Sequence, residues 1–86
     1  MFKIWAKQYD ENQRIIKSQT FEFKQDFDAR LLGAYMQVIC NEWKTECPIV
    51  LSSHIIGFDT FNHTRFSKSD FIDYVEFNTL SVQLIA

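Results

Sequence analysis

The chain has 86 residues, a formal net charge of −2 and 47% apolar residues, with only two glycines and one proline. This length corresponds to a single small globular domain over residues 1–86, and the apolar content argues against an intrinsically disordered chain. The net negative charge argues against a protein that binds duplex DNA, because such proteins neutralise phosphates with Lys and Arg.

Residues 2–9 alternate between two faces, as a strand does. Phe2, Ile4 and Ala6 share one face, and Lys3, Trp5, Lys7 and Tyr9 share the other. Residues 14–23 are rich in β-branched and aromatic side chains and predict a second strand, joined to the first by the polar turn 10–13. A two-residue loop at Glu11 and Asn12 would place Phe2 opposite Phe21 and Trp5 opposite Ser18.

Residues 26–46 predict a long helix, with Asp26 or Asp28 as the N-cap and Pro48 as the stop signal. Its apolar residues cover an arc of roughly 200°, wider than the ~100° needed to face one sheet. They are Phe27, Leu31, Leu32, Tyr35, Met36, Val38, Ile39, Cys40 and Trp43. A helix with so wide an apolar arc needs a second cover, either from its own chain or from a partner subunit.

The rest of the chain predicts two more strands, at 49–52 and 79–86, and an irregular connection over 53–66. Ser67, followed three residues later by Asp70, predicts a cap for a short helix over 68–74. We expect the phenylalanines at 58, 61, 66 and 71 to be buried anchors that hold the connection as a lid. The fold class is therefore α+β, in the order ββαβ(α)β: a mainly antiparallel three- or four-stranded sheet with one long helix packed across a face. The last strand could run beside the first.

Lys3, Trp5, Lys7 and Tyr9, with Arg14 beside them in the hairpin, are candidate nucleic-acid-binding residues. If the helix covers the opposite face, they lie on the open side of the sheet, where aromatic rings can stack single-stranded bases while cations neutralise phosphates. The alternatives are a protein interface around Trp5 and Tyr9, or ordinary packing beneath the 53–71 segment. The net negative charge and the lack of a second basic cluster weigh against nucleic acid.

His54, Asp59, His63 and Arg65 are candidate residues for a polar site in the 53–66 connection. Two histidines and an aspartate can ligate a metal or transfer protons, but their spacing fits neither a helical nor a strand metal motif. No nucleophile elbow or oxyanion loop accompanies them. We therefore expect no metal, no cofactor and no catalytic residue, and we expect these side chains to hydrogen-bond loop backbone.

The two cysteines, Cys40 and Cys47, would lie two helical turns apart if both were on the helix, about 10 Å along its axis and beyond disulfide reach. With no signal-peptide pattern at the N-terminus and no apolar run near the ~18–20 residues of a membrane span, the sequence predicts a cytoplasmic protein with reduced thiols.

Three functional hypotheses follow. The first is a non-enzymatic accessory or protein-interaction domain, plausibly a homodimer, with Trp5, Tyr9, Met36 and Trp43 as interface candidates. The second is single-stranded nucleic-acid or nucleotide binding on the Lys3/Trp5/Lys7/Tyr9 face. The third is a small enzyme or ligand-binding protein that uses His54 and His63.

Overall fold

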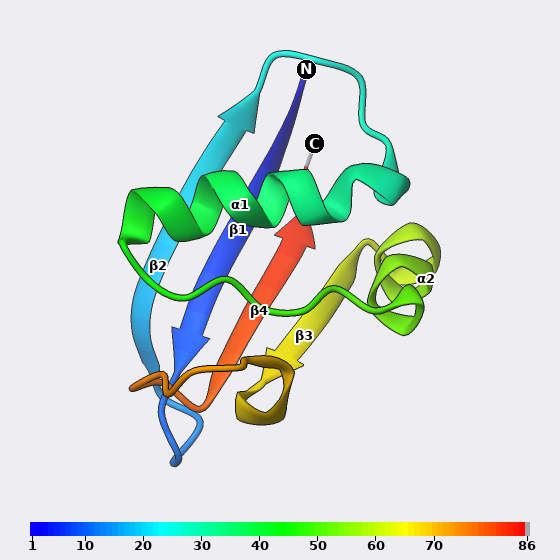
Figure 1. The fold of residues 1–86 in the computed structure, drawn as a ribbon. Coiled ribbons are helices and arrows are strands. Elements are labelled where there is room, and N and C mark those ends of the chain that lie inside the picture. Colours follow the sequence, from blue (N-terminus) through cyan, green and yellow to red (C-terminus); the bar gives the residue numbers. More distant parts are fainter. Residues whose placement is uncertain (86) are drawn as a thin grey trace.

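The computed structural model describes residues 1–85, which form a four-stranded antiparallel sheet with helices packed on one face (Figure 1). The strands are β1 (Phe2–Tyr9), β2 (Ile15–Phe23), β3 (His63–Ser67) and β4 (Thr79–Leu84), and they lie in the order β2-β1-β4-β3. The helices are the 3₁₀ turn η1 (Ala29–Leu31), α1 (Leu32–Trp43), α2 (Ser52–Phe61) and the 3₁₀ turn η2 (Lys68–Asp70). The predicted α+β class is confirmed, and β4 does run beside β1.

The two faces of β1 are as different as the sequence predicts. Phe2, Ile4 and Ala6 are buried beneath the helices. Lys3 is exposed on the opposite face, and Trp5 and Lys7 are half-buried there. In Figure 1, α1 crosses in front of the strands and α2 lies beside β3 at the edge of the sheet. The His54 ring of α2 packs on the buried Phe66 of β3, on the same side of the sheet as α1. Among residues 1–85, no helix covers the other side.

The predicted hairpin register is wrong by two residues, since Phe2 pairs with Phe23 and Trp5 pairs with Thr20. One residue comes from the loop, which has three residues and closes with Gln13 in the left-handed region at φ 62°. The other comes from a bulge between Gln8 and Tyr9. A two-residue shift returns every side chain to its predicted face, because strand side chains alternate with period two.

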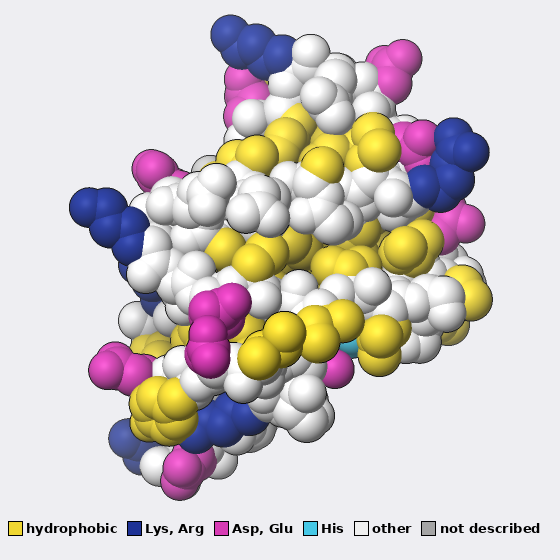
Figure 2. Space-filling model, viewed as in Figure 1, with side chains coloured by type: hydrophobic (Ala, Val, Ile, Leu, Met, Phe, Trp, Pro, Cys, Tyr) yellow, Lys and Arg dark blue, Asp and Glu magenta, His cyan; other side chains and the backbone are white. Residues whose placement is uncertain are grey.

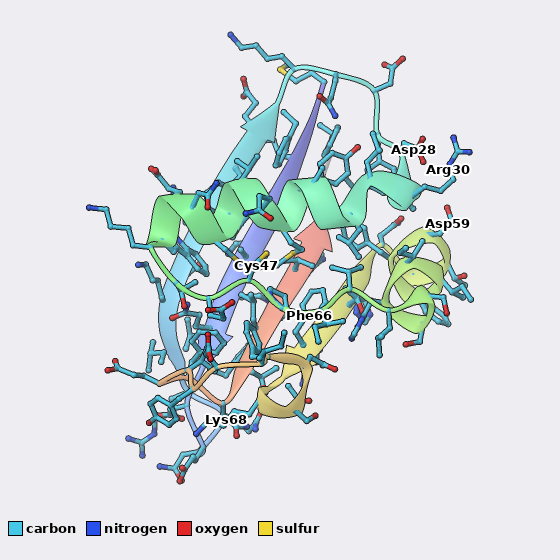
Figure 3. All side chains as sticks on the ribbon, viewed as in Figure 1. Asp28, Arg30, Cys47, Asp59, Phe66 and Lys68 are labelled. Atoms are coloured by element: carbon cyan, nitrogen blue, oxygen red, sulfur yellow. The ribbon has the colours of Figure 1, made fainter. Side chains whose placement is uncertain are left out.

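The long helix is shorter than predicted at both ends. Asp28 does act as the N-cap, of η1: its carboxylate accepts the Arg30 backbone N–H at 3.0 Å and pairs with the Arg30 guanidinium at 2.8 Å (Figure 3). The C-terminal end lies at Trp43 because Lys44 adopts the left-handed conformation, φ 53° and ψ 46°. Pro48 is therefore not the stop signal.

The apolar arc of α1 is only partly covered. Six of its side chains are buried against the sheet: Leu32, Tyr35, Met36, Ile39, Cys40 and Trp43. Leu31 and Val38 remain exposed on the outer side. The surplus width of the arc is thus left uncovered, rather than covered by a lid.

The segment after α1 is the largest departure from the prediction. Residues 49–52 form no strand; they lead into α2, and the third strand of the sheet is β3, within the segment predicted to be irregular. A short apolar run such as Ile49–Leu51 does not distinguish a strand from the approach to a helix. Figure 2 shows apolar side chains along this helix-bearing side of the molecule, and Ile49, Leu51 and Ile56 are among the exposed ones.

Three of the four predicted phenylalanine anchors are buried: Phe58, Phe66 and Phe71. Phe61 is 67% exposed, so that anchor is wrong. Phe61 ends α2, and Asn62 follows in the left-handed conformation before β3 begins. The predicted cap at Ser67 is confirmed, because the Asp70 carboxylate accepts the Ser67 backbone N–H at 2.9 Å. The helix predicted over 68–74 is shorter: it is the 3₁₀ turn η2, Lys68–Asp70.

Candidate functional site

The candidate site is the open face of the sheet, the side that carries no helix among residues 1–85. It lies behind the sheet in the view of Figure 1. β1 runs through its middle and presents Lys3, Trp5, Lys7 and Tyr9 on this side. The segment predicted to cover Trp5 and Tyr9 does not cover them, because α2 packs on the other side and β3 joins the sheet.

Cations and aromatic rings alternate along this face. The Lys7 ammonium lies 3.9 Å from the centre of the Trp5 ring and 5.9 Å from the centre of the Tyr9 ring. The Arg65 guanidinium carbon, from β3, lies 5.7 Å from the centre of the same Tyr9 ring. These distances lie within the range of cation–π attraction. Arg65, Tyr9, Lys7 and Trp5 therefore form one continuous row, which we call the cation–aromatic row.

The Trp5 end of the row is fixed by a hydrogen bond. The Trp5 indole Nε1–H donates to the Ser18 hydroxyl on β2 at 2.7 Å. Small side chains lie beneath the other end, since Ser81 and Thr79 of β4 are buried between β1 and β3. The row thus runs from β1 across β4 to β3, and the Trp5–Ser18 hydrogen bond links it to β2. Its large side chains lie above small neighbours.

The charge of this face is opposite to that of the whole chain. By the alternation of each strand, Lys3, Lys7 and Arg65 are its basic residues, and Glu22, opposite Lys3, is its acidic residue. The chain as a whole carries −2. The rest of the chain is therefore more acidic than the total suggests. Arg14, the fifth nucleic-acid candidate, lies in the exposed hairpin turn next to the Tyr9 end of β1.

The four polar candidates of the 53–66 segment do not converge on one site. His54 is buried on the helix-bearing side: its Nδ1 accepts the Leu51 backbone N–H at 2.9 Å, and its ring centre lies 4.4 Å from that of Phe66. Asp59 is exposed on the outside of α2 (Figure 3). His63 and Arg65 are exposed on β3 and face the open side.

His54 has a second polar neighbour in Asp70, whose carboxylate Oδ2 lies 3.5 Å from the ring Nε2. One ring nitrogen thus holds the start of α2, and the other faces η2. This arrangement uses both nitrogens of His54 to connect two short elements. Among residues 1–85, His, Cys, Asp and Glu side chains form no group of three or more that could hold a metal ion.

Two interface candidates of α1 are core residues. Met36 is fully buried, and Trp43 is 7% exposed and donates its indole N–H to the Gln19 side-chain oxygen at 2.7 Å. Neither side chain lies on the surface of the described chain. Trp5 and Tyr9 are the two aromatic candidates that remain accessible, because both are half-buried on the open face.

The two cysteines are neighbours, contrary to the distance expected from a continuous helix. The chain leaves α1 at Trp43 and turns back, which brings Cys47 beside Cys40. Burial raises the pKa of the Cys40 thiol, and the Cys47 thiol beside it raises this pKa further. Burial also raises the pKa of Cys47. Both are free thiols, and their raised pKa values make them poor nucleophiles.

Sequence reasoning missed His63 and Arg65 as members of the open face. The Phe61 ring, at the end of α2, lies 6.3 Å from the His63 ring at the edge formed by β3. His63 is level with Trp5 across the sheet, because both pair with Gln83 of β4. A signal was present: in residues 63–67 the apolar Phe66 and the small Thr64 alternate with polar side chains, which is the period of a strand.

No helix within residues 1–85 has both the length and the apolar character needed to cross a membrane. The chain was also compared with protein-family models, with curated proteins and with solved structures, and none of the three comparisons found a match.

Proposed function

We propose that this chain binds single-stranded nucleic acid on the open face of its sheet. The observation that carries the proposal is the cation–aromatic row, in which Arg65 of β3 joins Trp5, Lys7 and Tyr9 of β1. Proteins that bind single strands combine rings on which bases stack with cations that follow the phosphates, and each stacked base contributes about 1–3 kcal/mol.

The row suits a flexible single strand better than a duplex. Its rings are presented by a four-stranded sheet, and no helix lies on that face among residues 1–85 to enter a groove. Three basic residues provide a modest electrostatic attraction, consistent with contacts to a few phosphates. Trp5 and Tyr9 offer stacking positions on this face, and the exposed Phe61 ring lies beside His63 at its β3 edge.

Lys7 has a specific role in this proposal. Its ammonium covers the Trp5 ring at 3.9 Å, and a bound strand would draw that ammonium from the ring to a phosphate. The ring then becomes free for a base, and the ion pair replaces the weaker cation–π contact. Stacking and charge neutralisation are therefore coupled at the Trp5 end of the row.

The test is a titration of a fluorescently labelled oligothymidine of about ten nucleotides, followed by anisotropy at low salt. We expect Trp5→Ala to weaken binding by about 5- to 150-fold, which corresponds to the loss of one stacked base. The logarithm of the binding constant should fall with the logarithm of salt concentration with a slope of about −2, if the three basic residues each meet one phosphate.

Lys17→Ala is the matched control. Lys17 is an exposed cation on the same sheet, but it pairs with Gln8 and its ammonium lies over Trp43 on the helix-bearing side. Lys7→Ala and Arg65→Ala should weaken binding, and Lys17→Ala should not. Equal weakening by all three substitutions would indicate non-specific attraction, and no binding by the unaltered chain would reject the proposal.

The second candidate function is a non-enzymatic accessory or protein-interaction domain. It is favoured by the edge strand β2, whose Ile15 and Ile16 are each 53% exposed. Such a domain would bind a protein through this edge or through the open face, and it would show no affinity for the oligonucleotide. A protein that fails the anisotropy test but self-associates would fit this candidate.

A further inference from the structure

A cavity of about 530 Å³ lies on the helix-bearing side of the sheet, away from the cation–aromatic row. It is bounded by the N-terminal part of β2, by the C-terminal end of α1 with residues 44–46, and by residues 74–77, which are drawn in orange in Figure 1. Pockets that bind small molecules have volumes of about 300–1,000 Å³. The cavity is therefore large enough for a small organic ligand.

Gln8 of β1 lines this cavity, and its carboxamide is the feature that indicates a ligand. The residue follows Ala6 on the buried face of the strand and is only 8% exposed. Within residues 1–85 its carboxamide takes part in no side-chain hydrogen bond. No fully enclosed polar side-chain atom of these residues lacks a partner. The amide oxygen and nitrogen of Gln8 are therefore open to the cavity, where they offer an acceptor beside a donor.

The wall of the cavity is aromatic and apolar. Trp43, Val75 and Phe77 line it, and all three belong to the hydrophobic core. The Trp43 indole N–H is already bonded to the Gln19 side-chain oxygen, so the ring offers a ligand only its apolar surface. An apolar wall with one placed polar group is typical of small-molecule sites, in which the polar group fixes the orientation of the ligand.

Charge does not select the ligand of this cavity. Lys17 and Lys44 contribute two positive charges to its lining. Glu46 and Glu76 contribute two negative charges, so the formal charges cancel. The cavity differs in this respect from the open face, where basic residues outnumber acidic ones. A neutral, flat molecule with a donor and an acceptor side by side on one edge matches the cavity best.

We propose that this cavity binds the adenine base of a nucleoside. The Gln8 amide oxygen accepts a hydrogen bond from the adenine N6 amino group, and the Gln8 amide nitrogen donates to the adjacent ring nitrogen N7. Glutamine makes this bidentate pair with adenine in protein–DNA complexes. The purine ring packs against the apolar wall, and the ribose lies at the rim, where Lys44 and Glu46 are exposed.

The nucleoside site is independent of the proposed single-strand binding, because the two sites lie on opposite sides of the sheet. Each site has its own tryptophan: Trp5 belongs to the cation–aromatic row, and Trp43 lines the cavity. A chain that binds adenosine but no oligothymidine, or the reverse, would separate the two proposals.

The test is a titration with adenosine, followed by the NMR signals of the two indole N–H groups. The Trp43 signal should shift and saturate, while the Trp5 signal stays in place. Gln8→Leu removes the amide and keeps most of the side-chain volume, and it should weaken adenosine binding by about 5- to 150-fold. Gln37→Leu is the matched control, because it makes the same change at an exposed residue of α1 outside the cavity, and it should leave binding unaltered.

Two further comparisons test the place and the base. Thr45→Trp fills the cavity from residues 44–46 without changing Gln8, and it should abolish the Trp43 response. Thymidine, whose base has no exocyclic amino group, should bind more weakly than adenosine. An unchanged Trp5 signal shows that each variant is folded. An unmoved Trp43 signal, equal binding of thymidine, or a Gln8→Leu variant that binds adenosine as the unaltered chain does would overturn the proposal.

Discussion

At the scale of single residues, the two histidines of the chain have opposite environments. His54 is buried, holds the Leu51 N–H with Nδ1 and lies against Phe66. His63 is exposed on the open face. Replacing each histidine in turn therefore separates an effect on stability, at His54, from an effect on binding, at His63.

We predict that His54→Ala lowers the free energy of unfolding by about 1–3 kcal/mol, because it leaves the Leu51 N–H without its acceptor and removes ring packing. His63→Ala should change that free energy by less than about 0.5 kcal/mol, but it should weaken oligonucleotide binding. Urea denaturation and anisotropy measure the two effects. A stable His54→Ala variant would contradict the role assigned to the ring.

The buried cysteines predict a dependence of stability on pH. The pKa values of Cys40 and Cys47 are raised in the folded chain, so the folded state keeps its thiol protons after the unfolded chain has lost them. Their contribution is fully present below the unfolded pKa, which is about 8.5, and is lost as pH rises above it. The midpoint of urea unfolding should therefore fall from about pH 8 to about pH 10.

The double variant Cys40→Ala/Cys47→Ala isolates this effect from the titration of Lys and Tyr. Its unfolding midpoint should fall less steeply over the same pH range. Equal slopes for the two proteins would show that the thiols titrate alike in the folded and unfolded states, contrary to their burial.

At the scale of elements, the end of α1 is set by the left-handed residue Lys44. This conformation costs a residue with a Cβ about 1–2 kcal/mol, and glycine adopts it freely. We predict that Lys44→Gly raises the free energy of unfolding by about 0.5–1 kcal/mol, measured by urea denaturation. Lys44→Ala is the control, because it removes the same charge and keeps the strain. Stabilisation by both variants to the same extent would attribute the gain to charge instead.

The strands and the helices differ in how far the sequence predicts them. β1 is predictable because eight residues alternate without interruption, and a hairpin error of two residues leaves its faces intact. α2 is not predictable from its sequence, because Gly57 and the β-branched Ile55, Ile56 and Thr60 disfavour a helix. Its buried residues are only His54 and Phe58, which gives no clear helical pattern. Its helical pattern is too weak to detect, and tertiary packing overrides the propensity.

The candidate site, too, is predictable only where its residues lie on one strand. The sequence predicts Lys3, Trp5, Lys7 and Tyr9 on one face because a single strand carries them. Arg65 is 56 positions beyond Tyr9 in the chain, and it meets the Tyr9 ring only because β4 lies between β1 and β3. Local patterns carry no information about strand order, so this contact could not be predicted from the residues alone.

At the scale of the whole molecule, the two faces of the sheet differ in what they contact. One face, with Phe2, Ile4 and Ala6, supplies the core beneath α1, and core aromatics such as Phe58 and Phe66 are fully buried there. The other face carries the cation–aromatic row, whose side chains are not part of the hydrophobic core.

The two tryptophans allow the central claim to be tested within one molecule, because each indole N–H gives its own NMR signal. Trp5 lies on the open face and Trp43 lies beneath the sheet on the other side. On titration with oligothymidine at low salt, the account predicts that the Trp5 indole signal shifts and saturates, while the Trp43 signal stays in place. An unmoved Trp5 signal, or a Trp43 signal that shifts as much, would contradict it.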